Sequence, residues 1–260
     1  YSTSFFSAIK LLGREVRQPV HSIYGMVRLA DEIVDTFHDY NKRELLQRFE
    51  AETYQAIDEG ISLNPVLHCF QETVNRYGID RSLIDAFFQS MRADLVKTRY
   101  LDGAELKHYV YGSAESVGLM CLHVFTRGDR QQFEDLKEYA KALGAAFQKI
   151  NFLRDLKSDV EELDRSYFPG LDPATFTDSD KRRIVSDIEE DLRAGYEGIK
   201  RLPLSARLGV YVAYRYYLAL FRKLKDKAAP GILEARHRIP NHIKLVIVLK
   251  AGVRHQLNWI

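Results

Sequence analysis

Two acidic pairs, each spaced by one helical turn, are the residues in this sequence best suited to chemistry. The first segment carries four polar residues on one helical stripe, at i, i+4, i+7 and i+11: Tyr24, Arg28, Asp31 and Asp35. Carboxylates spaced in this way converge beside the helix, where they suit a hard divalent cation that keeps water and phosphate oxygens as ligands. The pattern predicts a site for Mg²⁺, or Mn²⁺, with a diphosphate.

A second segment repeats this arrangement. Its polar stripe, at i, i+3, i+7 and i+11, consists of Gln148, Asn151, Asp155 and Asp159. An arginine accompanies each acidic pair, Arg28 in the first segment and Arg154 in the second. A guanidinium binds phosphate oxygens in a bidentate manner, so these arginines are expected to contact the oxygens that the metals leave free. We expect the two stripes to face each other across a cavity.

An acidic pair alone is a weak signal, because pairs such as Glu134 and Glu138 have the same spacing and most of them lie on solvated helix faces. The flanking residues make the two segments specific. SIYGMVRLADEIVD from Ser22 and NFLRDLKSD from Asn151 resemble the two signature segments of the squalene/phytoene synthase family, the head-to-head prenyl synthases. The order and separation of the segments also fit that family.

The start of the chain resembles the opening H/Y-S-x-S-F segment of the family, in which hydroxyl groups and a helix N-terminus contact a diphosphate. The matching residues are Tyr1, Ser2, Ser4 and Phe5. Taken by themselves, small hydroxylated residues here equally well form a helix N-cap. By resemblance, Ile9 and Leu12 on the same helix help to line a prenyl tunnel, although their types also suit an ordinary core.

The stretch YVYGSAESVG, from Tyr109 to Gly118, resembles a further family segment in which small residues make room for a polyprenyl chain. Gly112, Ala114 and Gly118 let the backbone approach a ligand closely, but close packing between helices explains them equally well. Glu115 departs from the family pattern, which usually has glycine there. A carboxylate beside an apolar tunnel is costly, so either Glu115 points away or the local geometry differs.

Two further segments carry candidate substrate contacts. The aromatic helix that contains Tyr211, Tyr214, Tyr216 and Tyr217 is either ordinary core or a wall that shelters a carbocation. By resemblance, Tyr217 is the residue expected to have that role. Arg236, in ARHRIPNHIKL, resembles a late arginine of the family that reaches the diphosphate, and its alternative is a solvated basic turn.

The resemblance implies an all-α, isoprenoid-synthase-type helical bundle around a central cavity, and assigns residue roles. The expected metal ligands are Asp31, Asp35, Asn151, Asp155 and Asp159. The expected catalytic residues are Tyr24, Arg28, Asp31, Asp35, Tyr109, Asp155 and Asp159. The expected substrate contacts are Ser2, Ser4, Phe5, Ala114, Gly118, Gln148, Asn151, Arg154, Tyr217 and Arg236.

The implied reaction joins two isoprenoid diphosphates through a cyclopropylcarbinyl diphosphate, and our first choice of substrate is geranylgeranyl diphosphate, which gives phytoene. The alternative within the same family is the synthesis of squalene or dehydrosqualene from farnesyl diphosphate, with NADPH required only for squalene. A catalytically silent helical assembly factor is the alternative from another class, and the four intact acids argue against it. Isoprenoid cyclases are a third alternative, because Asn151, Asp155 and Asp159 resemble their second metal motif.

Composition sets the class of protein. The 260 residues, of which 46% are hydrophobic and 28% charged, are enough for one sizeable core, so we expect a single domain over 1–260. A net charge of +2 is too weakly basic to indicate nucleic-acid binding. Nucleotide-binding and zinc-protease motifs are absent from the sequence. The oligomeric state is left open.

Cysteine usage and hydropathy favour a cytoplasmic location. Cys69 and Cys121 are far apart within apolar runs, which is typical of buried free thiols in a reducing compartment. The sequence has no apolar run of about 18 residues that would span a bilayer. Because prenyl substrates are strongly apolar, we expect peripheral contact with membranes, with His242 to Arg254 as the candidate segment.

The helical pattern is continuous along the chain. All seven prolines fall where helical patterns start or stop, and no hairpin signal separates alternating strands. The loop from Ser166 to Thr177 follows the second acidic segment and is expected to cover or flank the metal site. Helices are predicted over 3–16, 20–38, 42–58, 64–76, 81–97, 103–126, 130–164, 178–200, 204–227 and 240–254.

Overall fold

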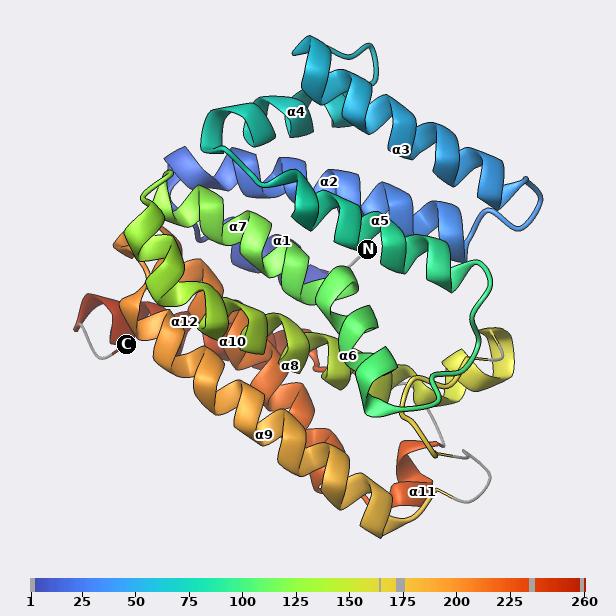
Figure 1. Ribbon diagram of the computed structural model, residues 1–260. Coiled ribbons are helices and arrows are strands. Elements are labelled where there is room, and N and C mark those ends of the chain that lie inside the picture. Colours follow the sequence, from blue (N-terminus) through green and yellow to red (C-terminus); the bar gives the residue numbers. More distant parts are fainter. Residues whose placement is uncertain (1–2, 164, 172–175, 234–236, 258–259) are drawn as a thin grey trace.

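The computed structural model describes residues 3–163, 165–171, 176–233, 237–257 and 260, and Figure 1 shows the arrangement of its helices. These residues contain no strand; they form one isolated bridge, between Arg99 and Ser166. The all-α prediction is confirmed. The helices are α1 (Thr3–Ile9), α2 (Arg14–Asp35), α3 (Lys42–Glu59), α4 (Pro65–Tyr77), α5 (Arg81–Asp94), α6 (Gly103–Val110), the π-helix η1 (Tyr111–Glu115), α7 (Ser116–Thr126), α8 (Arg130–Leu163), α9 (Asp178–Arg201), α10 (Leu204–Lys225), α11 (Ala229–Ile232) and α12 (Asn241–Gln256).

Local sequence fixes many helix ends. At the start of α9, the Thr177 side chain accepts from the Asp180 backbone N–H and the Asp180 carboxylate accepts from the backbone N–H of Thr177, which forms a capping box. Helices α3 and α4 end at Gly60 and Gly78, both at positive φ, where a glycine is favoured because it has no Cβ. Side-chain N-caps also start four other helices, and these caps are Asn41, Asn64, Asp80 and Asp102.

The prediction that every proline lies at a helix boundary is wrong for Pro19, which is inside α2. A proline has no N–H to donate, so the carbonyl of Glu15, four residues earlier, loses its usual partner. The hydroxyl of Tyr77 on α4 donates to that carbonyl at 3.3 Å. A tertiary contact therefore replaces the missing helical hydrogen bond, and α2 begins at Arg14 instead of near residue 20.

Two other predicted boundaries are wrong for local reasons. The helix predicted over 3–16 ends at Ile9, and the chain then turns so that Gly13 N–H donates to the carbonyl of Ser205 at 2.7 Å. The helix predicted over 103–126 is interrupted by the π-helix Tyr111–Glu115. There Gly112 packs so closely on α5 that a Cβ would lie 2.2 Å from the Ala86 carbonyl oxygen.

Helix α8 is the central element and has 34 residues, a length of about 51 Å. It packs between α7 and α9, which both run antiparallel to it. Small residues bring the backbones together: a Cβ on Gly144 would lie 2.9 Å from the Ala114 carbonyl oxygen, and one on Gly198 would lie 2.3 Å from Cβ of Tyr139. These contacts fix which residues of α8 face the interior.

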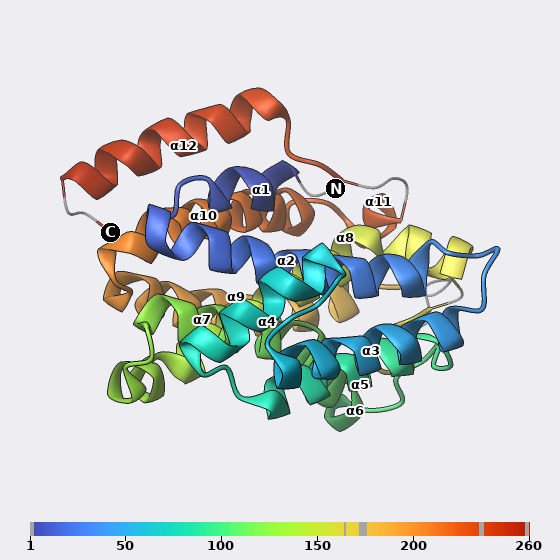
Figure 2. The same cartoon turned by 90° about the horizontal axis from the view of Figure 1, so that it is seen from above.

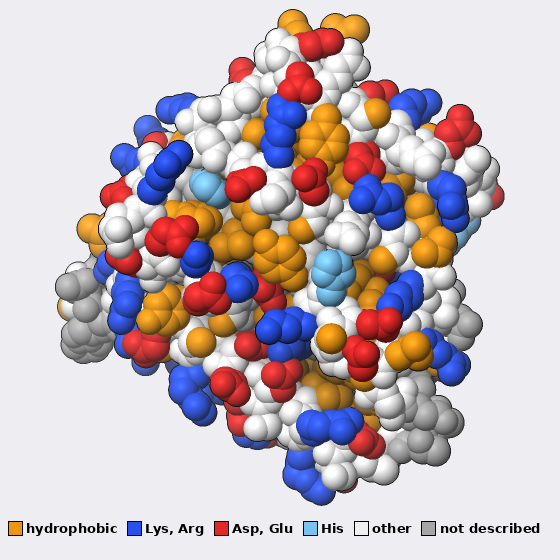
Figure 3. Space-filling model, in the orientation of Figure 1, with side chains coloured by type: hydrophobic (Ala, Val, Ile, Leu, Met, Phe, Trp, Pro, Cys, Tyr) orange, Lys and Arg blue, Asp and Glu red, His pale blue; other side chains and the backbone are white. Residues whose placement is uncertain are grey.

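The remaining helices enclose the same core. Helix α2 packs on α7, α10 packs on α9 and α1 packs on α10, and α12 lies on the outside against α10 (Figure 2). Charged side chains of both signs are interspersed over the face drawn in Figure 3. Within the described part of the chain, no helix has the length and hydropathy needed to cross a membrane.

Candidate active site

An apolar cavity of about 310 Å³ is lined by residues of α1, α2, η1, α7, α8, α9 and α10. One end is polar and is formed by Tyr24, Gln148, Asn151 and Tyr217. On α8 the lining residues extend from Asn151 to Leu136, which is 15 residues or about 22 Å of helix. The walls between are almost wholly apolar, so the cavity suits a long hydrocarbon chain whose polar head lies beside Asn151.

Hydrogen bonds order the polar end of the cavity. The Tyr217 hydroxyl donates to Oδ1 of Asn151 at 3.2 Å, and the Asn151 amide donates to Oε1 of Gln148 at 3.5 Å. The Gln148 amide in turn donates to Oγ of Ser113 at 3.3 Å. This chain of contacts joins α10, α8 and η1, and it fixes the side chains at the point where a substrate head would enter.

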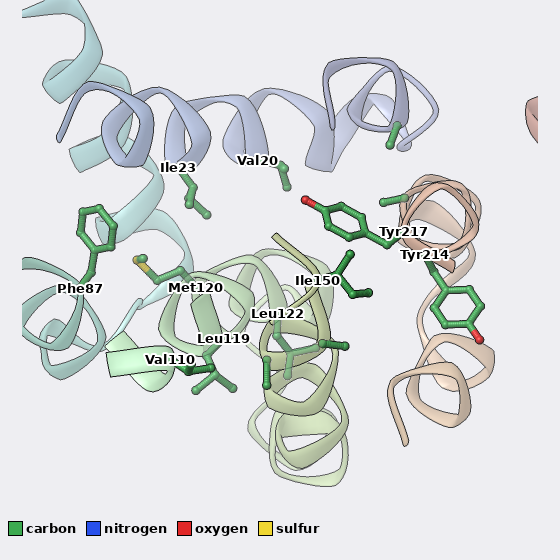
Figure 4. Packing of buried hydrophobic residues seen from close by; sticks show 14 of the residues in the cluster. Val20, Ile23, Phe87, Val110, Leu119, Met120, Leu122, Ile150, Tyr214 and Tyr217 are labelled. Atoms are coloured by element: carbon green, nitrogen blue, oxygen red, sulfur yellow. The ribbon is translucent and has the colours of Figure 1, made fainter. Parts of the chain in front are cut away.

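Aromatic rings surround the same end. The ring of Tyr217 stacks on Phe147 with centroids 4.0 Å apart, and Phe5 contacts both rings edge-on. In Figure 4, Tyr217 points from α10 toward α2 and Val20, whereas Tyr214 points away from the cavity. Of the four tyrosines on this helix, the one expected from resemblance is the one that lines the cavity.

The two acidic pairs lie close enough to affect each other electrostatically. Burial, and then the charge of Asp35, raises the pKa of Asp31 to about 6. Burial, and then the charges of Asp155 and Asp35, raise the pKa of Asp159 to about 7. Because Asp35 is on α2 and Asp159 is on α8, the fold brings the two predicted stripes together beside the polar end of the cavity.

Arginines partly neutralise this acidic cluster. Arg28 pairs with Asp31 and with Glu32 on its own helix, and Arg154 Nε donates to Oδ1 of Asp155 at 2.9 Å. Both guanidiniums therefore contact carboxylates in this structure. Their predicted contacts with phosphate oxygens stay predictions.

Two residues of the site, Asp94 and Arg165, were missed by the sequence reasoning. The Tyr109 hydroxyl donates to Oδ2 of Asp94 at 2.8 Å, and burial raises the pKa of Asp94 to about 7. Arg165 contacts both Asp35 and the backbone of Asp94. Neither residue belongs to a recognisable sequence motif. The one available signal was position, because Arg165 directly precedes the loop from Ser166 to Thr177, which was expected to cover or flank the metal site.

The donor set fits a divalent cation bound together with a ligand. The raised pKa values of Asp31 and Asp159 reflect carboxylates that a cation would stabilise in their charged form. Among the described residues, no group of three or more His, Cys, Asp or Glu side chains is placed to hold an ion alone. Mg²⁺ commonly keeps phosphate and water ligands beside one or two carboxylates, so this arrangement suits it.

The other candidate residues fall into three groups. Phe5, Tyr24, Ala114 and Gly118 line the cavity together with Gln148, Asn151 and Tyr217, and so do Ile9 and Leu12. Tyr109 does not line the cavity; it packs against Tyr100, Phe152 and Tyr167. Ser2, Arg236 and the side chain of Ser4 lie outside the described residues.

Glu115, the departure from the family pattern, is buried within the π-helix but does not line the cavity. The charged groups that influence its pKa include Lys141 and Lys149 on α8 and Asp191 on α9. The sequence left two possibilities open for Glu115: a side chain that points away from the cavity, or a different local geometry. Both are observed, because Glu115 is not part of the cavity lining and the segment Tyr111–Glu115 is a π-helix. Cys69 and Cys121 are free thiols, as expected, but both are half-buried and not fully buried as predicted.

Comparison with known proteins places the chain in a family. The squalene/phytoene synthase family model matches residues 1–242. Phytoene synthase 2 of Zea mays is 32% identical over 180 residues, which cover 65% of this chain and 42% of the maize protein. Phytoene synthase of Arthrospira platensis is 27% identical over 282 residues, which cover 98% of this chain and 89% of that protein. The chain spans less than two thirds of the maize relatives, 42% and 63% for two of them.

Solved structures share the fold. A dehydrosqualene synthase in complex with ligand superposes with a TM-score of 0.83 at 20% identity, covering 98% of this chain and 92% of its own. A squalene synthase, HpnC from Alicyclobacillus acidocaldarius, superposes with a TM-score of 0.74 at 19% identity, covering 86% of this chain and 88% of its own. The fold is therefore of the isoprenoid-synthase type, and the chain belongs to the squalene/phytoene synthase family.

Proposed function

We propose that the protein is a prenyltransferase that joins two molecules of geranylgeranyl diphosphate head to head and forms phytoene through a cyclopropylcarbinyl diphosphate. The observation that carries the choice of substrate is the length of the cavity, about 22 Å from Asn151 to Leu136 along α8. Each isoprene unit adds four main-chain carbons, or about 5 Å at ordinary C–C bond lengths. A C20 chain of about 20 Å fills this length, whereas a C15 chain leaves about one isoprene unit empty.

The acidic residues would hold the metal. Asp31 and Asp35 would bind it from α2, and Asn151, Asp155 and Asp159 from α8. When bound, Mg²⁺ supplies positive charge that stabilises the departing diphosphate. Arg28 and Arg154 lie next to these carboxylates and would contribute guanidinium donors to the phosphate oxygens.

The cavity residues would protect the cation that remains. Phe5, Phe147 and Tyr217 present aromatic rings beside the polar end, and a ring face stabilises positive charge without acting as a nucleophile. The apolar walls below them exclude water, which would otherwise capture the cation. Tyr24 and Tyr109 are proposed to contact the diphosphate or to assist proton removal. Tyr24 lines the cavity, whereas Tyr109 is buried outside it and would act through Asp94, to which its hydroxyl donates.

Product analysis tests the proposal. The full chain is incubated with geranylgeranyl diphosphate or with farnesyl diphosphate, with Mg²⁺ and with Mn²⁺, each with and without NADPH. We expect a C40 hydrocarbon from the C20 substrate without NADPH, and no product when EDTA is present. A C30 product alone from a mixture of both substrates would favour dehydrosqualene or squalene synthesis, the names carried by two structural relatives. Absence of product from either substrate would contradict the reaction class.

A further inference from the structure

Helix α12 presents an apolar face to the outside of the molecule. Thirteen large apolar side chains are exposed among the described residues, and six of them lie between Ile243 and Leu257. Leu245, Leu249 and Val253 are the most exposed of the six, at 60%, 62% and 56%. At 100° per residue these three lie on one face of the helix, and Val246 and Leu257 adjoin them.

The opposite face of α12 holds the helix on the protein. Ile247 and Ala251 are buried, and the helix packs against α10. Near the end of the helix, Arg254 Nη1 donates to the Tyr211 hydroxyl at 3.1 Å. Figure 2 shows α12 at the edge of the molecule with nothing described beyond it. A surface helix usually exposes its polar face and buries its apolar face. In α12 an apolar stripe is exposed to the outside, and a second face, with Ile247 and Ala251, is packed on the protein.

The charged side chains of α12 are all basic. The sequence has no Asp or Glu from Ala235 to Ile260, whereas α12 itself carries lysine, arginine and histidine side chains. Lys250 and Arg254 are exposed along one edge of the apolar stripe. An occupant of this face must therefore tolerate apolar contact and supply negative charge.

We propose that α12 is an interfacial helix that docks the protein on an anionic lipid surface, lying in the plane of the membrane. A bilayer supplies both requirements, because its acyl region accepts Leu245, Leu249 and Val253 while anionic headgroups lie level with Lys250. A second copy of this chain fits less well, since a twofold contact between α12 helices would bring cations together with no carboxylate on either helix to neutralise them. With 16 residues, α12 is too short to span a bilayer.

Vesicle binding tests this proposal independently of the proposed reaction, because it needs no substrate. The 260-residue chain is sedimented with vesicles of phosphatidylcholine containing phosphatidylglycerol, and with vesicles of phosphatidylcholine alone. We expect binding to the anionic vesicles, weakened by salt, and a loss of about tenfold or more in the double variant Leu245→Gln, Leu249→Gln. Lys250→Glu is expected to weaken binding to anionic vesicles only.

A matched control changes the same residue type elsewhere. Leu63 and Leu101 are 100% and 79% exposed, and they precede α4 and α6. The double variant Leu63→Gln, Leu101→Gln should bind vesicles as the unchanged protein does. Equal vesicle binding by the α12 and control variants would overturn the proposal. So would a dimer in analytical ultracentrifugation that the α12 variant abolishes, with no vesicle binding by the unchanged protein. Product formation from detergent-dispersed substrate, measured on the same samples, reports separately on the proposed reaction.

Discussion

Arg165 Nη1 donates to Oδ1 of Asp35 at 3.1 Å, although the two residues are 130 positions apart in the chain. Its Nη2 donates to the backbone carbonyl of Asp94 at 2.8 Å. The side chain of Arg165 is only 10% exposed. One guanidinium thus ties the segment after α8 to the acidic pair of α2 and to the end of α5.

Replacing Arg165 with Gln is expected to reduce stability by about 1–3 kcal/mol, because it leaves a buried carbonyl and a carboxylate without their charged donor. Urea unfolding measures the change. Arg127→Gln is the matched control: Arg127 pairs with Glu15, but the two side chains are 58% and 47% exposed. An exposed pair contributes about 0–1 kcal/mol, so the control should lose much less stability. Equal losses in the two variants would contradict the role assigned to Arg165.

Asp31→Asn, and likewise Asp155→Asn, is expected to reduce turnover by about a hundredfold or more, because each removes a charged oxygen proposed to bind the metal. Stability should be maintained in Asp31→Asn, since the raised pKa of Asp31 shows that its charge is unfavourable in the folded protein. Product yield and thermal unfolding, measured on the same preparation, test both expectations. Near-normal turnover in millimolar Mg²⁺ would contradict the proposed site.

Glu115→Gln should remove one contribution to the pH dependence of stability, a contribution that falls as the pH rises. Burial raises the pKa of Glu115, with Lys107, Lys141, Lys149 and Asp191 as the charged groups around it. An acid with a raised folded-state pKa stabilises the protein fully below its unfolded pKa, and this contribution is lost as the pH rises through the folded value. Glu115→Gln has no carboxyl to ionise at this position, so it does not lose this stability as the pH rises. The free energy of unfolding of the variant, relative to that of the unchanged protein, should therefore increase as the pH rises above about 4.5.

Urea unfolding at a series of pH values between 4 and 8 would measure this dependence for Glu115→Gln. Glu59→Gln, at an exposed position at the end of α3, is the control. A difference between Glu115→Gln and the unchanged protein that stays constant over this range would contradict the prediction.

Local patterns were enough to predict the helical class. Some cavity-lining residues, such as Ala114 and Tyr217, were expected from the resemblance, but most of the lining, including Leu136 and Ile199, was not predicted. Positions such as Asn151 and Asp155 are fixed by helical spacing alone, and capping residues such as Thr177 mark where helices begin. Predictions from local sequence patterns were wrong or incomplete where the structure of a segment depends on a contact with a residue distant in the chain. Pro19 continues a helix because Tyr77 satisfies the carbonyl that the proline leaves free. Asp94 belongs to the site because Tyr109 and Arg165 reach it, and no spacing within α5 indicates this.

The cavity offers a graded test of substrate length. Ala114 lies level with Gly144, which is seven residues or about 10 Å along α8 from Asn151. Cys121 lines the cavity further down, one turn beyond the contact of Gly118 with Ala140 and thus about 20 Å from Asn151. A phenylalanine at Ala114 should therefore block both the C15 and the C20 chain, whereas one at Cys121 should block the C20 chain only.

Relative kcat/KM for the two substrates measures this difference. We expect Cys121→Phe to lower the value for geranylgeranyl diphosphate by about tenfold or more and to leave farnesyl diphosphate nearly unchanged, because excluding the terminal isoprene unit forfeits a few kcal/mol of apolar burial at about 0.8 kcal/mol per CH₂. Ala114→Phe should lower both values. Cys121→Val, which adds little volume, controls for loss of the thiol. If Cys121→Phe and Ala114→Phe affected the two substrates in the same ratio, the chain would not extend along α8 as proposed.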